Sequence, residues 1–520
     1  MTFGARTALI LVALLPVLGT IYQTLVLTDL VDEDIRRGIE SDKLDGTWLS
    51  ASWGLSMLYG VFAGLLVSKK IGPRNALVTG LFIFSLGNFA CGYSSSFEEM
   101  MIARFVEGLG KGMAIVLLRS FLYSRFDGMV FCAVLCYGTL AYSTRGTSPM
   151  VAAIVNEHLG WRWVYWASVP LGIAGMGLIL LLVPSDSHTT HLGKSESKPD
   201  GLLINLLVFW LISLLFVLGW RQREGAFTSN LFTGLFALNI MLLVVIVGRI
   251  INSYARSDQL SRLIRSRHYL CAMGGRMLLL LHLAAVLGVF SSFLTQARGM
   301  PAVSAGEVFM PASGSMAISF LACALVPNRD WRHLTLLVGV LGAACSVYWL
   351  ATAGLATSVA QLTLMMMVWG ACVGTIPASF LIDEVEILDK SDMPVASAFA
   401  IVVLATPLIL VPSFMGTAVT EGQLAAFDLQ RQMIRADRPV VMDTIARGAE
   451  YFTNRGIDGI QAPVLAGGLL AGVVELESVS CGIQSGLRLL AMLTGALGLA
   501  VSVPLLLDPG TRIVKLRQQH

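Results

Sequence analysis

Long apolar segments recur along the whole chain, separated by short polar ones. Each runs for roughly 18 to 25 residues, enough for a helix rising about 1.5 Å per residue to cross a hydrocarbon layer about 30 Å thick. No segment alternates with period two, so helices are expected rather than barrel strands. The pattern predicts about fourteen membrane spans, at residues 7–28, 47–67, 75–94, 99–122, 130–155, 161–183, 202–220, 230–250, 269–294, 305–326, 334–353, 359–380, 395–417 and 485–507.

Composition supports a membrane protein. Hydrophobic residues make up 55% of the chain and charged residues 13%, whereas soluble domains carry about a quarter charged residues. The longest polar stretch, residues 418–484, is too short for a catalytic domain. We therefore expect an all-α polytopic membrane protein that is not an enzyme.

The distribution of basic residues predicts the orientation. With the N-terminus inside, eighteen Lys and Arg residues fall in cytoplasmic segments and seven in short loops on the opposite side. Because an excess of basic residues marks the cytoplasmic face, both termini are expected in the cytoplasm. The protein is then expected in the cytoplasmic (inner) membrane, with segment 418–484 outside.

The spans group into halves. A linker rich in Ser, His and Lys at 185–200 separates a six-helix bundle at 1–184 from two inserted helices and a basic loop at 201–268. A second six-helix bundle is expected at 269–520, an arrangement that transporters use for alternating access. Residues 423–452 alternate apolar and charged positions at helical spacing, which predicts an amphipathic external helix facing lipid or a partner.

Three segments carry a family resemblance. Residues 64–74, GLLVSKKIGPR, resemble the loop G-x-L-x-D-R-x-G-R-R/K, and residues 104–112, RFVEGLGKG, resemble R-x-x-Q-G-x-G-x-G. Residues 145–153, RGTSPMVAA, followed by GWRWVY at 160–165 and PLG at 170–172, resemble an antiporter signature G-P-x-x-G-G followed by W-R-W-x-F and N-x-P-x-G. Together they resemble the major facilitator superfamily, in particular its fourteen-helix drug:proton antiporter branch of EmrB/QacA type.

The resemblance implies a major facilitator fold, with two six-helix bundles plus two extra helices, and a set of gating and conformational residues. Those residues are Gly64, Ser68, Gly72, Arg74, Gly108, Gly112, Ser148 and Pro149. Glycine suits the tight turn after the second span and close helix packing on the fourth. The chain departs from the family at Ser68, where the family has Asp, at Ser148, where it has Gly, and at Tyr22, which precedes Gln23 in place of the D of D-Q-T.

Ionisable residues inside the first bundle are candidates for substrate binding or coupling. Arg104, Glu107 and Lys111 share one helix face by their spacing of three and four, and Arg145 lies in the fifth span. Ionisable residues in spans usually face a pathway. Alternatively, Arg104 extends to the interface, or Glu107 and Lys111 form a self-neutralising pair that fixes packing. Cations facing a cavity would favour an anionic or weakly acidic amphiphile.

The second half offers other proton carriers. His282 lies deep in the ninth span beyond Arg276, and titrates near neutral pH when unperturbed. A lone His in a span is also compatible with hydrogen-bonded packing. Glu107 and Glu307 are the alternative proton carriers, because burial in a span raises the pKa of a carboxyl group toward the working range. The acidic run 383–389 is expected in a solvated cytoplasmic loop.

The resemblance implies a secondary exporter of amphipathic toxic compounds, of multidrug efflux type, by proton antiport. The alternative is a transporter of one endogenous anionic metabolite or lipid-like compound with weak or no proton coupling, which the departures and the cationic interior favour. A third class, a non-transporting membrane sensor or assembly subunit, would need a sizeable soluble domain, and the sequence shows none.

The expected partners are a small amphipathic substrate, anionic in one interpretation, together with protons and membrane lipid. EmrB-like relatives often work with a periplasmic adaptor and an outer-membrane channel, and segment 418–484 is the expected docking region. The sequence has no P-loop and no metal-ligand spacing. We therefore expect no cofactor, no metal and no nucleic-acid partner.

Overall fold

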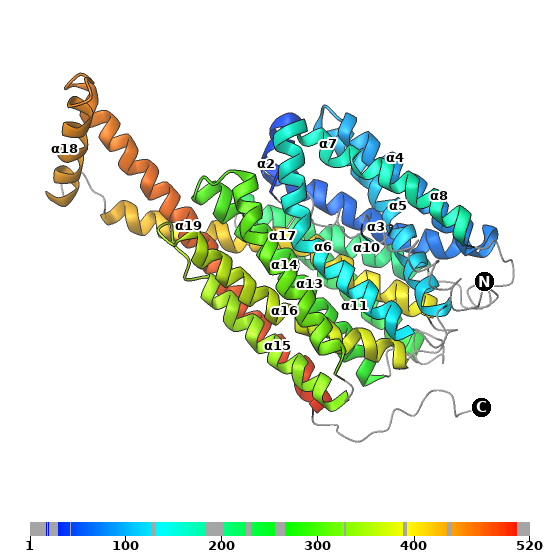
Figure 1. Ribbon diagram of the computed structural model, residues 1–520. Helices are drawn as coiled ribbons and strands as arrows, with labels where there is room; N and C mark the ends of the chain where they lie inside the picture. The colour runs from blue at the N-terminus through cyan, green and yellow to red at the C-terminus, as the bar shows by residue number, and fades with distance from the viewer. Residues whose placement is uncertain are drawn as a thin grey trace.

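The structure is a computed structural model. It describes residues 17, 19, 30–41, 43–125, 130–183, 201–224, 230–254, 266–326, 329–387, 393–433 and 439–506. Every regular element within these ranges is a helix (Figure 1).

The first half of the described chain holds one short helix and the helices of a bundle. These are α2 (Asp32–Gly38), α3 (Lys43–Ile71), α4 (Pro73–Tyr93), α5 (Phe97–Arg125), α6 (Val130–Leu159), α7 (Trp161–Trp166) and α8 (Ser168–Leu182). Helices α7 and α8 together form one span, Trp161–Leu182. Helices α10 (Gly201–Glu224) and α11 (Asn230–Tyr254) follow and contact each other.

The second half holds the second bundle. It comprises α13 (Arg267–Ser292), the π-helix η1 (Phe293–Ala297), α14 (Ala302–Ala324), α15 (Arg329–Leu350), α16 (Val359–Ile387), α17 (Met393–Met433), α18 (Pro439–Thr453) and α19 (Gln461–Leu506). The two halves meet along two seams, where α6 packs against α14 and α3 packs against α17.

The predicted spans coincide with helices. Thirteen of them, from 47–67 onward, each fall on a helix or helix pair, and ten helices of the described residues are long and apolar enough to cross a membrane. The first predicted span, 7–28, lies outside the described residues except for 17 and 19. The prediction of an all-helical, multi-pass membrane fold is confirmed.

Glycines on α5 allow the tight packing of the first bundle. A Cβ atom at Gly108 would lie 2.2 Å from the backbone oxygen of Trp53, and one at Gly112 would lie 2.1 Å from that of Met57. Real side chains do not approach so closely, so α3 and α5 are in direct backbone contact here. This is the close approach that the glycines of the motif predict.

A helical arm projects from the bundle. Helices α17 and α19 have 41 and 46 residues, or roughly 60 to 70 Å by helical rise, about twice the thickness of a hydrocarbon core. Both extend beyond the other helices, and α18 lies at the far end (Figure 1). Instead of one helix over 423–452, that stretch contains the end of α17 and most of α18, while residues 434–438 lie outside the described residues.

The acidic run near the end of α16 also differs from expectation. Helix α16 continues to Ile387 and includes Asp383, Glu384 and Glu386, so the prediction of a loop at these residues is wrong. Asp389 lies outside the described residues.

Candidate functional site

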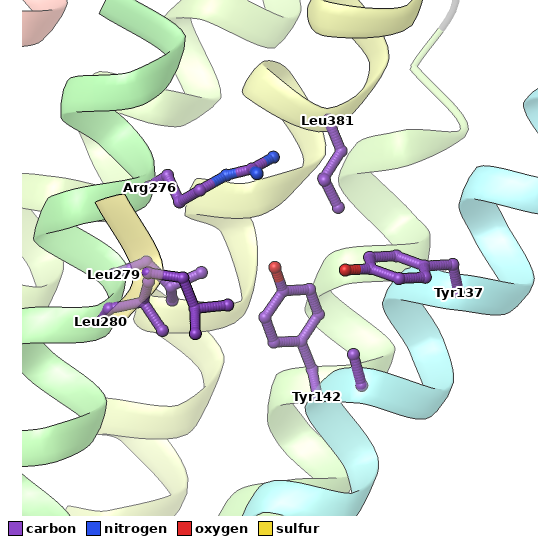
Figure 2. Close-up of a pocket in the computed structure, with 8 residues that line it drawn as sticks. Tyr137, Tyr142, Arg276, Leu279, Leu280 and Leu381 are labelled. Atoms are coloured by element: carbon purple, nitrogen blue, oxygen red, sulfur yellow. The ribbon is translucent and has the colours of Figure 1, made fainter. Parts of the chain in front are cut away.

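A small cavity lies between the two bundles. It has a volume of about 20 Å³ and is lined by Tyr137, Ala141, Tyr142, Arg276, Leu279, Leu280, Leu381 and Leu404 (Figure 2). The lining residues come from α6 of the first half and from α13, α16 and α17 of the second. A space of this size holds about one water molecule. The bundles are therefore closely apposed here.

Three polar side chains surround this cavity. Figure 2 shows the hydroxyl of Tyr142 directed toward Arg276 and the hydroxyl of Tyr137 directed into the same space. All three residues are buried, and the guanidinium of Arg276 lies 5.3 Å from the ring centroid of Phe380. Stacking on an aromatic ring stabilises a desolvated cation. The cavity thus combines one cationic group and two hydroxyls with an aliphatic wall.

A second polar cluster lies inside the first bundle, on α5. Nη1 of Arg104 donates a 2.7 Å hydrogen bond to Oε2 of Glu107, and both side chains are buried. Lys111 is fully buried, with its Nζ 4.8 Å from the ring centroid of Trp53 on α3. Arg104 lies 5.5 Å from the ring centroid of Tyr165 on α7.

The contacts of this cluster bear on the earlier alternatives. The buried side chain of Arg104 pairs with Glu107 on the same helix. Neither Arg104 nor Lys111 lines the cavity between the bundles, so the expectation that these cations face it does not hold in this conformation. Oε1 of Glu107 is buried and has no hydrogen-bond partner among the described residues. This oxygen is thus able to accept a further hydrogen bond.

The first motif connects α3, α4 and α8. Gly72, between α3 and α4, has φ of 83°, which favours glycine. Arg74 donates a hydrogen bond to the backbone oxygen of Leu180 at the end of α8. Oγ of Ser68 donates to the backbone oxygen of Leu65, 2.8 Å away on its own helix. The Ser68 hydroxyl therefore does not replace the interhelical contact that a carboxylate offers.

The antiporter-like motif lies at a seam. Oγ of Ser148 donates a 2.5 Å hydrogen bond to the backbone oxygen of Thr144, and Pro149 lies within α6. A Cβ atom at Gly306 of α14 would lie 2.7 Å from the sulfur of Met150. The motif segment thus packs directly against the other half.

Several expected residues lie elsewhere or cannot be placed. His282 is fully buried in α13 with no hydrogen bond at either ring nitrogen among the described residues, and it does not line the cavity. Glu307 is exposed on α14, on a stripe shared with Met310 and Ile318, so the expectation of its burial is wrong. The side chain of Arg145 and all of Tyr22 and Gln23 lie outside the described residues.

The cavity contains two residues that the sequence did not single out. Tyr137 and Tyr142 carry no charge and belong to no motif, and their only signal is a pair of hydroxyls within an apolar span. Arg276 is recognisable from sequence as a cation deep in a span. Its position across the cavity from these tyrosines depends on how α6 and α13 face each other.

The chain is similar to known transporters. A family model described as Major Facilitator Superfamily matches residues 2–412. The chain is 23% identical over 270 residues to the putative multidrug resistance protein MdtD of Escherichia coli O1:K1, over 52% of this chain and 56% of that protein. It is 24% identical over 370 residues to the multidrug transporter protein MdtP of Bacillus subtilis, over 68% of this chain and 64% of that protein.

A third relative and one solved structure extend the comparison. An uncharacterized MFS-type transporter of Mycobacterium tuberculosis, Rv1250, is 26% identical over 145 residues, 28% of this chain and 25% of that protein. The matches thus cover less than two thirds of each relative. The xylose transporter XylE from E. coli, in a partially occluded inward-open conformation, is similar with a TM-score of 0.54 and 14% identity, over 79% of this chain and 91% of that chain. The latter likeness shows the fold alone.

Proposed function

This chain belongs to the Major Facilitator Superfamily, and on that premise we propose that it is a secondary transporter that exports amphipathic toxic compounds by proton antiport. It would work by alternating access in the cytoplasmic membrane, with both termini in the cytoplasm. The similarity to MdtD, a putative multidrug resistance protein, and to MdtP, a multidrug transporter protein, supplies the class of multidrug substrates. The division into bundles at 1–184 and 269–520, with inserted helices between them, is part of the proposal.

The observation that carries the proposal is the cavity between the bundles. Its residues come from both halves, so a rocking motion of one bundle against the other changes its size. Arg276, Tyr137 and Tyr142 offer hydrogen-bond donors, while Leu279, Leu280, Leu381 and Leu404 offer apolar surface. This combination suits an amphipathic substrate that carries a hydrogen-bond acceptor.

Glu107 is the proposed proton carrier. A proton that binds its buried oxygen Oε1 converts the carboxylate to a neutral acid and weakens the 2.7 Å ion pair with Arg104. Release of the proton restores the pair. The ion pair joins two turns of α5, and α5 packs on α3 at the seam with α17. Making or breaking the pair is therefore coupled to the packing of the two halves.

An alternative substrate class has its own supporting observation. None of the eight residues lining the cavity is a carboxylate, and one is Arg276. A guanidinium has five N–H donors, so Arg276 can also donate to the acidic head group of an anionic or weakly acidic amphiphile. A transporter of one endogenous anion, with weak or no coupling, is therefore the second candidate, and the departures at Ser68 and Ser148 agree with it.

The arm is the proposed docking region for a periplasmic adaptor. The adaptor would connect the transporter to an outer-membrane channel. Apolar side chains that stand far out on the arm are exposed, including Val440 on α18 and Ile460 and Val464 near the start of α19. Exposed apolar groups outside the membrane mark interaction surfaces. In the proposed orientation, this end of the molecule faces away from the cytoplasm.

Everted membrane vesicles test the function. A pH gradient is imposed, and 8-anilinonaphthalene-1-sulfonate or tetraphenylphosphonium is added as an anionic or a cationic amphiphile. Substrate-dependent discharge of the gradient, absent from vesicles without the protein, supports antiport. Substrate accumulation with no discharge would favour the second candidate. No accumulation of either probe would argue against both.

A further inference from the structure

Helix α10 lies over one of the seams between the bundles. It contacts both α3 and α17, which pack against each other there. The ring centroids of Trp48 and Phe216 lie 4.7 Å apart, and the hydroxyl of Tyr59 donates a 3.3 Å hydrogen bond to Oδ1 of Asn205. These contacts are separated by eleven residues on each helix, from 48 to 59 and from 205 to 216. The helices therefore run antiparallel side by side for about 16 Å.

A cavity of about 350 Å³ opens beside the Tyr59–Asn205 contact. It is lined by Tyr59, Leu202, Asn205, Leu206, Val208, Phe209 and Ile212. This volume is in the range of sites for drug-sized ligands. The wall is apolar apart from the hydroxyl of Tyr59 and the carboxamide of Asn205, and none of the seven residues is charged. We call this cavity the α3–α10 groove.

The polar pair joins the interior of α3 to the beginning of α10. Tyr59 is twelve residues from Ile71, where α3 ends, or about 18 Å by helical rise, whereas Asn205 is four residues from Gly201, where α10 begins, or about 6 Å. Asn205 is exposed, at the edge of the apolar stretch of α10. An exposed amide beside apolar surface gains free energy when its remaining hydrogen bonds are made.

The hydrogen bond from Tyr59 uses only the oxygen of the carboxamide. The two N–H groups of Asn205 are donors and are suited to an acceptor on a bound molecule. The side chains of Leu206, Phe209 and Ile212 provide apolar surface beside them. A ligand that fits has an apolar body and one hydrogen-bonding head group, and carries no charge.

We propose that the α3–α10 groove binds an uncharged amphiphile that enters from the lipid, and that it is the loading site of the transporter. This rests on the proposed function, since α10 covers the seam along which the bundles would move. A weakly acidic amphiphile in its protonated form has the required chemistry. Once ionised, the same molecule suits the guanidinium of Arg276 in the cavity between the bundles.

Photolabelling in proteoliposomes tests the groove without requiring transport. The probe is a long-chain fatty alcohol with a mid-chain diazirine and a terminal alkyne, and labelled positions are mapped by mass spectrometry. Labelling of 202–212 is expected to saturate with probe concentration and to fall when unlabelled fatty alcohol is added. Asn205→Leu keeps the side-chain size but removes the donors, so apparent affinity should fall roughly fivefold, the effect of one hydrogen bond.

Ile212→Trp is the second variant, because it fills the groove and should abolish saturable labelling. The matched control is Val244→Trp, which adds the same ring at an exposed position of α11 outside the groove and should label as the wild type does. Labelling of 202–212 that rises linearly with probe, ignores competitor and is equal in all variants would overturn the proposal. If the protein transports substrate but the labelling is of this non-saturable kind, the groove is rejected as a binding site while the proposed function stands. Saturable labelling without transport would support the groove and contradict the proposed function.

Discussion

Arg104 and Glu107 form a buried ion pair on one face of α5, with 2.7 Å between Nη1 and Oε2. The pair lies beside Trp53 and Tyr165, away from the cavity between the bundles. Charge compensation within one helix lets two ionised groups remain in a water-poor interior. The same arrangement makes the pair sensitive to a single proton on Glu107.

Loss of one partner should destabilise the protein more than loss of both. Arg104→Leu leaves the carboxylate of Glu107 buried without its counter-charge, and we expect a cost of about 3 kcal/mol or more. Combining Arg104→Leu with Glu107→Leu removes both charges and should recover most of that loss. Thermal unfolding of the purified protein in detergent measures the difference. Equal destabilisation by the single and double variants would contradict the structural role given to the pair.

Gly108 should not tolerate a methyl group. In Gly108→Ala the new Cβ would lie within 2.2 Å of Ser56 Oγ and of the Trp53 backbone oxygen, so α3 and α5 must separate at a cost of about 1–3 kcal/mol. The matched control is Gly177→Ala on α8, where nothing lies within 4 Å of the added atom. That variant should be neutral or more stable by up to about 1 kcal/mol, since alanine favours helix. Equal melting temperatures for the two variants would contradict the packing.

Arg276 should select acidic substrates. We expect Arg276→Gln to lower kcat/KM for 8-anilinonaphthalene-1-sulfonate by about tenfold, the effect of roughly 1.4 kcal/mol, because a hydrogen bond to a charged group is lost. Transport of tetraphenylphosphonium should be unchanged or improved. Tyr142→Phe removes one hydroxyl but keeps the ring beside Phe320, and its effect should be smaller. An equal loss for both probes in Arg276→Gln would show a general defect instead of charge selection.

The arm should be dispensable for transport in isolated vesicles but necessary for assembly. Ile460→Ser with Val464→Ser removes two exposed apolar side chains near the start of α19. Discharge of the pH gradient should persist, while co-purification with an adaptor expressed alongside should be lost. Glu450→Gln, an exposed change on α18, serves as the control and should retain the adaptor. Loss of vesicle transport in the double variant would place the arm in the transport cycle itself.

The sequence predicted the helices well because apolar length alone specifies a membrane span. It also pointed to Gly108 and Gly112, since close packing of helices requires the absence of a side chain. It did not predict which way a helix faces, which is why Glu307 was expected inside and lies on an exposed stripe with Met310 and Ile318.

Neither the cavity nor the arm could be predicted from local sequence patterns, and the reasons differ. Tyr137 and Tyr142 line the same cavity as Arg276 because α6 and α13, from opposite halves, face each other. The arm arises because α17 and α19 remain helical far past the thickness of a membrane. The sequence predicted one amphipathic helix over 423–452, where the structure has the end of α17 and most of α18.

The central claim is that Glu107 carries the proton that drives export. The most direct measurement is proton movement during transport of 8-anilinonaphthalene-1-sulfonate by purified protein in proteoliposomes that contain a pH-sensitive dye. Wild-type protein should move protons in step with the substrate, whereas Glu107→Gln should retain substrate exchange but move no protons with it. Proton movement in Glu107→Gln equal to that of the wild type, at equal substrate flux, would contradict the claim.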